Sequence, residues 1–344
     1  MKSFVFVCCF SVLSTICLAQ SGGFAFRENS AKKEVAVTYK GKLLTAYCWY
    51  DSIKKPFLFP LNTLEGVTVT RGYPIAPRPG ERADHPHHVG LWLNYESVNG
   101  LDFWNHSTAI PFEKRRGYGT ILHQKVTAQK AAGDNATLSA SATWVRPDGV
   151  ALLDEKTTFR FSVKNNVFFI DRITTLTARD TTVLFKDVKD GFLAIRVARE
   201  LELPSQQADV FVDAQGNETT VAKVDTTGIT GMYYSSGGLR GDSVWSIQGP
   251  WVMLKGRREG SAVTIGMIDH PANVGYPTYW HARGYGLFAL NPLGREVFSN
   301  GKEQLNLTLK PGASVTFRYR VVLTSTDVTT DQMNAFATDF KCMK

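Results

Sequence analysis

Apolar and polar residues alternate along most of this chain, and this pattern limits the fold more than any other feature. Clear examples are EVAVTYK at 34–40, ATLSASATWV at 136–145 and SVTFRYRVVL at 314–323. Successive side chains of a strand point to opposite faces, so alternation with period two indicates strands with one buried and one exposed face. The same pattern recurs at 66–71, 120–130, 157–165, 192–203, 262–268 and 304–309.

Turn-forming residues separate these segments. Pro147-Asp148-Gly149, Asn165-Asn166 and Pro311-Gly312 each stand between two alternating segments, and such residues favour tight turns. No Pro/Ser-rich linker and no repeat divides residues 20–344. We therefore predict an all-β protein, a large antiparallel β-sandwich of about twenty short strands, in a single domain over residues 20–344.

One short helix is predicted at the C-terminus. The stretch TTDQ at 329–332 has the spacing of a capping box, in which a Thr and a Gln side chain bind each other's backbone amides. Met333, Phe336 and Phe340 follow at helical spacing. We expect this helix to cover a sheet edge or one mouth of the sandwich.

Residues 1–19 read MKSFVFVCCFSVLSTICLA and have the layout of a secretory signal peptide. Lys2 precedes an apolar run too short to span a membrane, and small residues precede a cleavage site before Gln20. We therefore expect a periplasmic or secreted protein. Export removes three of the five cysteines and leaves Cys48 and Cys342, either as a disulfide or as one buried and one exposed thiol.

The net charge of +8 is spread along the chain. The densest basic spots are 114–116 and 257–258, with no basic tail or helical stripe, so binding to nucleic acid is not expected. No apolar run of about 18 or more residues follows the signal, and we expect no transmembrane segment. The sequence contains neither a phosphate-binding loop nor a Gly-x-Ser-x-Gly elbow.

The run ADHPHHVGLW at 83–92 places three histidines in four positions. In an extended segment stiffened by its proline, His85 and His87 share one face and His88 takes the other. Two imidazoles on one face can bind a metal with further ligands from elsewhere. Alternatively, one histidine transfers protons while a carboxylate such as Asp84 orients it. A structural role, in which the histidines bind the backbone of their own loop, is the third interpretation.

Aromatic residues follow the histidines. Trp92 and Trp104 lie close in sequence to the amide of Asn94 and the carboxylate of Asp102. Aromatic rings stack on the C–H faces of sugars while amides and carboxylates bind the hydroxyls. This mixture indicates a saccharide site, with the aromatic core of a sandwich as the alternative, above all for Trp92.

A second polar cluster occupies FKDVKDGFLAIRVARE at 185–200. Asp187 and Asp190 flank Lys189, and Arg196 follows on a predicted strand. Paired carboxyl groups beside a cation can act as acid and base, because the neighbours shift their pKa values apart. The alternative is a charged turn at the entrance of a strand.

A third cluster occupies DHPANVGYPTYWHARGYG at 269–286. Its first three residues repeat the Asp-His-Pro order of 84–86. Trp280, His281 and Arg283 then combine an aromatic ring, an imidazole and a guanidinium, as in the wall of a binding pocket. Arg283 would suit a carboxylate or another oxyanion.

These blocks together resemble a family of exported bacterial proteins called PmoA-like, sometimes labelled methane oxygenase. The resemblance rests on ERADHPHHVGLW with VNGLDFW, on DVKDGFLAIRVA, on SGGLRGDSVWSIQGPWV and on DHPANVGYPTYWHARGYGLFALNP. Val89 stands where that family usually has arginine, and Asp190 where it usually has glutamate. The resemblance implies an exported β-sandwich protein connected with the use of polysaccharides by bacteria. The oxygenase label does not fit a chain without spanning helices.

The expected sandwich is also similar to that of aldose mutarotases and related lyases. In those proteins a mutarotase-like supersandwich carries a histidine and a carboxylate on a concave sheet. We therefore interpret the chain as an exported carbohydrate-active enzyme, a glycosidase, lyase or epimerase that acts on glycan fragments by His/carboxylate acid–base chemistry.

The residues expected to carry this activity come from all three clusters. The candidate catalytic residues are His87, His88, Asp190 and His281. The candidate substrate-binding residues are Arg82, Asn94, Trp104, Lys189, Arg196, Trp280 and Arg283. The alternatives are a non-catalytic glycan-binding protein, which like the enzyme needs no cofactor, and a metalloprotein that binds a divalent metal ion through His85 and His87. The partner expected in the first two cases is a saccharide, and no oligomeric state is indicated.

Overall fold

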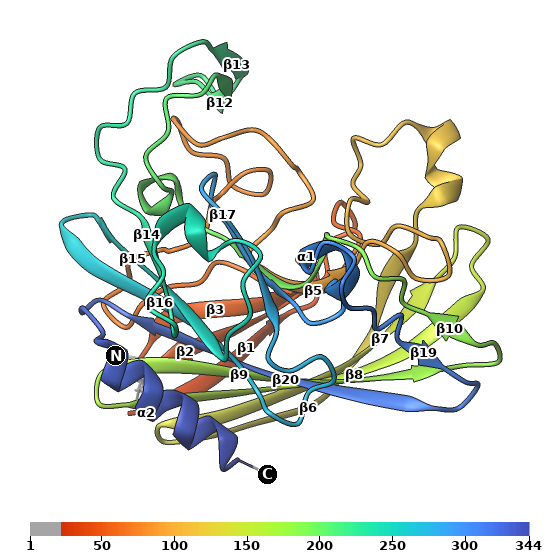
Figure 1. The fold of residues 1–344 in the computed structure, drawn as a ribbon. Coiled ribbons are helices and arrows are strands. Elements are labelled where there is room, and N and C mark those ends of the chain that lie inside the picture. Colours follow the sequence, from red (N-terminus) through yellow and green to blue (C-terminus); the bar gives the residue numbers. More distant parts are fainter. Residues whose placement is uncertain (1–21, 344) are drawn as a thin grey trace, which may run out of the picture.

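The computed structural model describes residues 22–343 and shows a protein built almost entirely of antiparallel strands (Figure 1). Within this range there are two eight-stranded sheets and two short two-stranded pairings. The first sheet contains, in spatial order, β1 (Phe24–Asn29), β2 (Glu34–Tyr39), β3 (Lys42–Cys48), β4 (Phe57–Leu58), β5 (Leu91–Tyr95), β11 (Gly191–Arg196), β18 (Leu287–Asn291) and β17 (Tyr279–Arg283).

The second sheet contains, in spatial order, β14 (Met232–Ser235), β15 (Trp251–Arg258), β16 (Ser261–Asp269), β20 (Ser314–Thr324), β9 (Val167–Ala178), β8 (Ala151–Lys164), β7 (Asn135–Val145) and β6 (Thr120–Ala132). The short pairings are β10 (Val183–Leu184) with β19 (Thr308–Leu309) and β12 (Asp209–Val212) with β13 (Glu218–Val221). The helical elements are η1 (Phe112–Gly117), η2 (Arg199–Leu201), η3 (Gly241–Val244), α1 (Arg295–Phe298) and α2 (Thr330–Lys341).

The two large sheets pack face to face around one hydrophobic core. Leu93 and Ile195 of the first sheet and Ile265 and Phe317 of the second belong to the same buried cluster. Burial of such side chains is the main force that holds two sheets together. The predicted all-β fold, a large antiparallel sandwich with a short C-terminal helix, is confirmed.

Most predicted strands coincide with observed ones, and three do not. Residues 34–40, 120–130, 136–145, 157–165, 262–268 and 314–323 fall in β2, β6, β7, β8, β16 and β20. The segment 192–203 leaves the sheet after Arg196, and β11 is buried on both faces because loops cover its outer side. Residues 304–309 pair only in β19, and 66–71 forms isolated bridges through Thr68 and Thr70.

The C-terminal helix α2 begins with the predicted capping box. The Thr329 side chain accepts a hydrogen bond from the Gln332 amide, and the Gln332 side chain accepts one from the Thr329 amide. Met333 and Phe340 pack with Trp251 and Val322 on the outer face of the second sheet. The helix therefore covers a sheet face, and the expectation that it covers an edge or a mouth was wrong (Figure 1).

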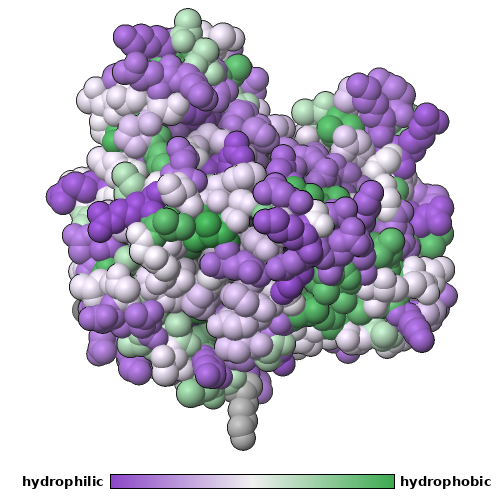
Figure 2. Space-filling model, in the orientation of Figure 1, coloured by the Kyte–Doolittle hydropathy of each residue, from purple (hydrophilic) through white to green (hydrophobic). Residues whose placement is uncertain are grey.

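Long loops cover the outer face of the first sheet, on the side of the molecule away from α2 (Figure 1). The hairpin β12–β13 and the segment around η1 form two projections on this side. Figure 2 shows the surface hollowed between these projections. The loop-rich stretch 72–118 supplies much of this cover.

Three sequence expectations concern single residues or termini. Cys48 is buried and Cys342 is exposed, and both thiols are free, so the disulfide alternative is not formed. No helix within residues 22–343 has the length and hydrophobicity to cross a membrane. The predicted signal peptide, residues 1–19, lies outside the described residues.

Candidate functional site

The histidine run forms a tight turn, and the expectation of an extended segment was wrong. The His88 amide donates to the His85 carbonyl over 2.9 Å, with Pro86 inside the turn, where its fixed φ is favourable. His85 has a φ of 45°, a left-handed conformation that histidine adopts more readily than most residues. The turn brings all three imidazoles together, with ring centroids 4.3–5.5 Å apart.

The side chain of Arg71 stabilises this turn through hydrogen bonds to its backbone. Its guanidinium donates to the carbonyl oxygens of Arg82, Asp84, His85 and His88 over 2.8–3.1 Å. Arg71 is buried, and a buried guanidinium needs several acceptors to offset the loss of its hydration. The loop therefore wraps around Arg71, a residue that sequence reasoning did not identify.

Asp84 connects the turn to the first sheet. Its Oδ1 accepts hydrogen bonds of 2.6 Å from both Arg71 and Arg196, and its Oδ2 accepts one of 2.7 Å from Nδ1 of His85. Burial alone would raise the pKa of Asp84, but the charge of Arg196, the His85 hydrogen bond and the charge of Arg71 together place this pKa well below its usual range. Asp84 is therefore a carboxylate.

His85 is the exposed member of the three histidines, with a side chain 43% accessible. Because an ionised carboxylate can only accept, the Nδ1 atom of His85 carries a proton toward Asp84. This hydrogen bond leaves the Nε2 atom of His85 free for a ligand. The ring is stacked on both sides, with Tyr285 at 5.3 Å and His88 at 4.8 Å between centroids.

His87 and His88 are buried, at 9% and 2% exposure. Burial, followed by the charge of Lys55 for His87 and that of His87 for His88, lowers both pKa values well below the usual range. Arg196 donates to Nδ1 of His88 over 3.2 Å, so the single proton of His88 lies on Nε2. Within residues 22–343 neither Nε2 atom has a hydrogen-bond partner.

The register of the first sheet places two further candidates near this turn. Across β5, β11, β18 and β17, cross-strand partners form the row Trp92, Ala194, Ala289 and His281, and such partners share one face. The next row contains Arg196, Leu287 and Arg283. His281, Arg196 and Arg283 therefore all point to the outer face of the sheet, where the loops lie.

Trp280 lies on the opposite face from its neighbour His281. Its ring is fully buried in the core between the sheets, and its Nε1 donates to the Gly249 carbonyl over 3.0 Å. The expectation that Trp280 stacks on a sugar is therefore corrected: the alternation of β17 directs Trp280 inward and His281 and Arg283 outward.

The predicted carboxylate turn meets both other segments. The Oδ1 atom of Asp190 lies 3.7 Å from Nδ1 of His281 and 3.7 Å from Nζ of Lys189. Burial raises the pKa of Asp190, Lys189 lowers it, Asp102 raises it and the charge of His85 lowers it. The net shift is upward, so Asp190 keeps its proton to a higher pH than an ordinary aspartate.

His281 and Asp187 differ from Asp190 in their surroundings. Burial, with the charges of Lys189 and Arg283, lowers the pKa of His281 to about 3, so this imidazole is neutral. Asp187 is buried and accepts hydrogen bonds from the amides of residues 296, 305 and 306. Asp187 fixes a loop and is not available as the second catalytic carboxyl group.

Several predicted substrate-binding residues have structural partners instead. Asn94 is buried, accepts a hydrogen bond from Nε1 of Trp92 and donates to the Phe103 carbonyl. Trp104 is buried against the edge of His88, with centroids 5.7 Å apart. Neither has a side-chain face open to a sugar, so both assignments are corrected. Arg196 is likewise fully buried and holds Asp84 and His88.

The second Asp-His-Pro sequence lies on the other sheet. Asp269, at the end of β16, accepts hydrogen bonds from the amides of His270 and Thr278. The ring of His270 packs edge-on against Phe340 of α2, with centroids 5.1 Å apart. The repeated motif therefore supports the C-terminal helix and takes no part in the cluster around Asp84.

Two pockets border the histidine turn. The first, called here the Trp245 pocket, has a volume of about 410 Å³ and is lined by Arg82, Asp209, Asp242, Trp245, Arg283 and Tyr285, among others. The second, of about 500 Å³, includes Pro86 and His87 of the turn together with Tyr50, Tyr73 and His106. Both cavities mix aromatic and polar side chains.

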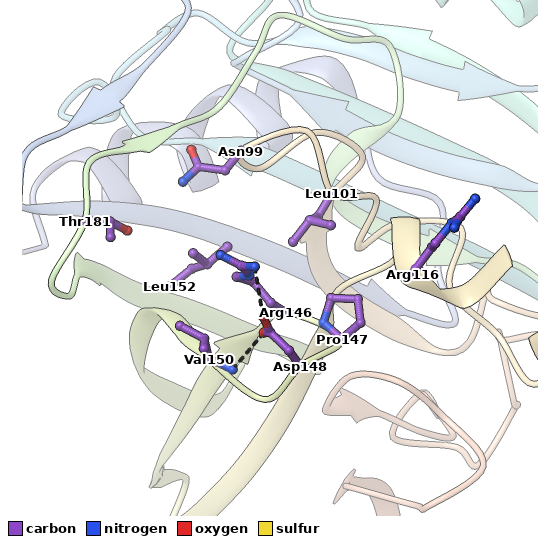
Figure 3. Close-up of a pocket in the computed structure, with 9 residues that line it drawn as sticks. All are labelled: Asn99, Leu101, Arg116, Arg146, Pro147, Asp148, Val150, Leu152 and Thr181. Carbon is purple, nitrogen blue, oxygen red and sulfur yellow. Dashed lines mark hydrogen bonds and ion pairs between the residues drawn. The ribbon is translucent and has the colours of Figure 1, made fainter. Parts of the chain in front are cut away.

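A larger pocket of about 570 Å³ lies away from this region (Figure 3). It contains none of the predicted site residues. Arg146 and Asp148 in its wall bind each other over 2.8 Å, and Arg116 points away from the other labelled side chains. Size alone therefore does not identify the functional site.

The metal-binding alternative requires more ligands than the turn supplies. The rings of His85 and His87 are 5.5 Å apart and perpendicular rather than side by side. In the part of the chain that the structure describes, no group of three or more His, Cys, Asp or Glu side chains is arranged to hold a metal ion. Zinc and similar ions in proteins usually have three or four such ligands.

Residues 34–338 match the model of a family described as a family of unknown function, DUF6807. The chain belongs to this family. No curated protein matches the sequence. The match to DUF6807 includes the histidine turn, the Asp190 turn and strand β17, so all parts of the cluster lie within the family's shared region.

This DUF6807 chain also has similarity to solved structures of carbohydrate-active proteins. One is the galactosidase domain of the α-galactosidase–sucrose kinase AgaSK, with 12% identity, a TM-score of 0.40, and coverage of 87% of this chain and 41% of that one. The chain thus spans about two fifths of that structure. Another is galactose 1-epimerase from Lactobacillus acidophilus NCFM, with 11% identity, a TM-score of 0.38, and coverage of 88% and 97%.

Proposed function

We propose that this protein is an exported carbohydrate-active enzyme in which His85 and Asp190 transfer protons to and from a sugar. The observation that carries the proposal is the pairing of His85 with a carboxylate anchored by two arginines, where the charge of His85 also acts on Asp190, a carboxyl group with a raised pKa. General acid–base catalysis requires a proton acceptor and a proton donor within reach of the same substrate.

His85 has the features of the base. The hydrogen bond to Asp84 fixes the proton on Nδ1 and the lone pair on Nε2. Tyr285 and His88 hold the ring plane between them. Asp84 also stabilises the positive charge that His85 acquires when it accepts a proton, because the carboxylate cannot move away from its two arginines.

Asp190 has the features of the acid. Its raised pKa lets Asp190 keep its proton to a higher pH than an ordinary aspartate does. Glu96 and Asp102 in the same region also have pKa values raised by burial, and the charge of Asp190 raises that of Glu96 further. A group of crowded carboxyl groups retains protons more readily than isolated ones.

The bordering pockets support a sugar as the substrate. The Trp245 pocket places Trp245 and Tyr285 beside Asp242 and Arg283, and the second pocket places Tyr50 and Tyr73 beside hydroxyl-bearing and imidazole side chains. Aromatic faces with polar groups around them suit sugar rings. The resemblance to exported PmoA-like proteins supports a periplasmic or secreted setting in polysaccharide use.

The test is a panel of oligosaccharides incubated with the chain that begins at Gln20, with products identified by mass. Hydrolysis adds one water to the products, elimination yields an unsaturated sugar, and epimerisation leaves the mass unchanged. We expect His85→Gln and Asp190→Asn each to lower turnover by about 10²- to 10⁴-fold. His123→Gln, which changes a histidine stacked on Trp49 elsewhere in the protein, is the control.

Two results would count against the proposal. Unchanged turnover in both His85→Gln and Asp190→Asn would remove these residues from the reaction. Binding of oligosaccharides without conversion of any panel member would identify a glycan-binding protein instead.

A further inference from the structure

The Trp245 pocket contains two arginines with different surroundings. Arg82 is buried and bound by two carboxylates, Glu202 at 2.8 Å and Asp209. Arg283, at the end of β17, has no ion pair and no side-chain hydrogen bond with any residue from 22 to 343. The protein thus neutralises one guanidinium of this pocket and leaves the other unpaired.

Arg283 is held in place by aromatic rings. Its Cζ atom lies 5.6 Å from the ring centroid of Trp245 and 5.9 Å from that of Tyr285. Such contacts orient a guanidinium without using its N–H donors. The planar edge of Arg283 therefore remains available to bind a carboxylate with two parallel hydrogen bonds.

Trp245 differs from the other tryptophans of the protein. Of the other six, Trp92, Trp104, Trp144, Trp251 and Trp280 are buried and Trp49 is half-buried, whereas Trp245 is 37% exposed. It follows η3 and packs edge-on against Phe298, with centroids 6.0 Å apart. An indole fixed at one edge and accessible to solvent is a suitable platform for a sugar ring.

We propose that the Trp245 pocket binds an acidic sugar residue, a uronate, whose carboxylate pairs with Arg283 and whose ring packs on Trp245. Asp242 lines the same pocket without an ion pair among the described residues. It can accept a hydrogen bond from a sugar hydroxyl, and its charge directs the ligand carboxylate toward Arg283. The inference deepens the proposed function, on which the choice of a sugar rests.

Tyr285 links this pocket to the proposed catalytic pair. It lines the pocket and stacks on His85 with an interplanar angle of 6°. Burial raises the pKa of Tyr285 to about 12, the charges of Arg196 and Arg283 oppose this shift, and those of Asp190 and Asp84 add to it. A uronate held by Arg283 therefore lies beside the residues proposed to transfer protons.

The test compares binding of two matched oligosaccharides by calorimetry at low salt, one with uronic acid residues and one with the corresponding neutral sugars. We expect the wild-type protein to bind the acidic oligosaccharide roughly tenfold or more tightly than the neutral one, as one charge-assisted pair would give. Arg283→Met should abolish this preference, and Arg283→Lys should keep part of it. Arg116→Met, which removes an equal charge at the pocket of Figure 3, should leave the preference unchanged.

The outcomes separate this inference from the proposed function. Three results would overturn the inference. The wild-type protein could bind both oligosaccharides with equal affinity, it could fail to bind the acidic one, or a folded Arg283→Met variant could keep the preference unchanged. Conversion of neutral sugars that depends on His85 would then leave the proposed function intact. Conversely, the protein could bind uronate through Arg283 without converting any sugar through His85. That result would support the proposed uronate site and refute the proposed enzymatic function.

Discussion

Nδ1 of His85 lies 2.7 Å from Oδ2 of Asp84, and this hydrogen bond joins an exposed imidazole to a buried anion. The two partners have different roles in the fold. Asp84 forms ion pairs with Arg71 and Arg196, which are both fully buried, whereas His85 contacts neighbouring rings at the surface. Substitutions at these adjacent positions should therefore affect stability very differently.

We expect Asp84→Asn to lower the free energy of unfolding by about 3–5 kcal/mol, because the change leaves two buried guanidinium groups without their anion. His85→Gln should cost about 1 kcal/mol or less, because its side chain is 43% exposed. Urea unfolding at neutral pH measures both values. Equal losses in the two variants would show that Asp84 does not hold the arginines as described.

Lys55 gives a pH dependence of known sign. It is buried, donates to the His87 carbonyl over 2.7 Å and lies 5.4 Å from the centroid of Trp92. Burial lowers the pKa of Lys55 to about 7, against the opposing charge of Asp102. Between pH 7 and the ordinary lysine value of about 10.4, the unfolded chain therefore binds more protons than the folded one, and stability should rise with pH.

We expect this rise to have a slope of up to about 1.4 kcal/mol per pH unit in the wild-type protein. Lys55→Met should reduce the slope, because methionine has no proton to lose. Denaturant unfolding at a series of pH values from neutral to alkaline measures the effect. Lys54→Met, at the neighbouring position, serves as the control, and identical slopes in all three proteins would refute the expectation.

The two cysteines should react at different rates. Burial raises the pKa of the Cys48 thiol to about 12, whereas Cys342 is exposed near the C-terminus, and thiolates rather than thiols attack disulfide reagents. In the chain that begins at Gln20, a thiol reagent should modify one cysteine in the native state and both after denaturation. Modification of neither thiol in the unfolded chain without reductant would indicate that they form a disulfide.

The cap and the contact face of α2 should contribute separately to stability. Thr329→Ala removes half of the capping box and should cost about 1 kcal/mol. Phe340→Ala removes a ring buried between Arg320 and His270 and should cost about 3–5 kcal/mol. Phe112→Ala, at a side chain 84% exposed, is the control for both and should change the free energy of unfolding little.

The fold could be predicted because its determinants are local. Alternation fixes which face of a strand is buried, and β7 shows it from Asn135 to Ala142. The capping box of α2 depends on residues only three positions apart. Strand β11 was less predictable, because distant loops bury its second face and only the tertiary structure reveals this.

The site could be predicted only in part. The structure brings the three predicted clusters together around Asp84, Asp190 and His281, but the roles within them depend on tertiary contacts. The conformation of the histidine turn is set by Arg71, which lies outside the run. The inward position of Trp280 was available from the alternation of β17, whereas the exposure of Trp245 has no local signal in the sequence.

Arg71 binds the turn through the carbonyl oxygens of four residues. Every amino acid supplies such an oxygen, so the backbone of this turn depends little on the side chain of residue 88 and requires at residue 85 only a side chain that tolerates a φ of 45°. Related chains can therefore exchange the reactive groups displayed there and acquire new chemistry without rebuilding the scaffold beneath. Among chains that descend from one ancestor, the activity should therefore change faster than the fold.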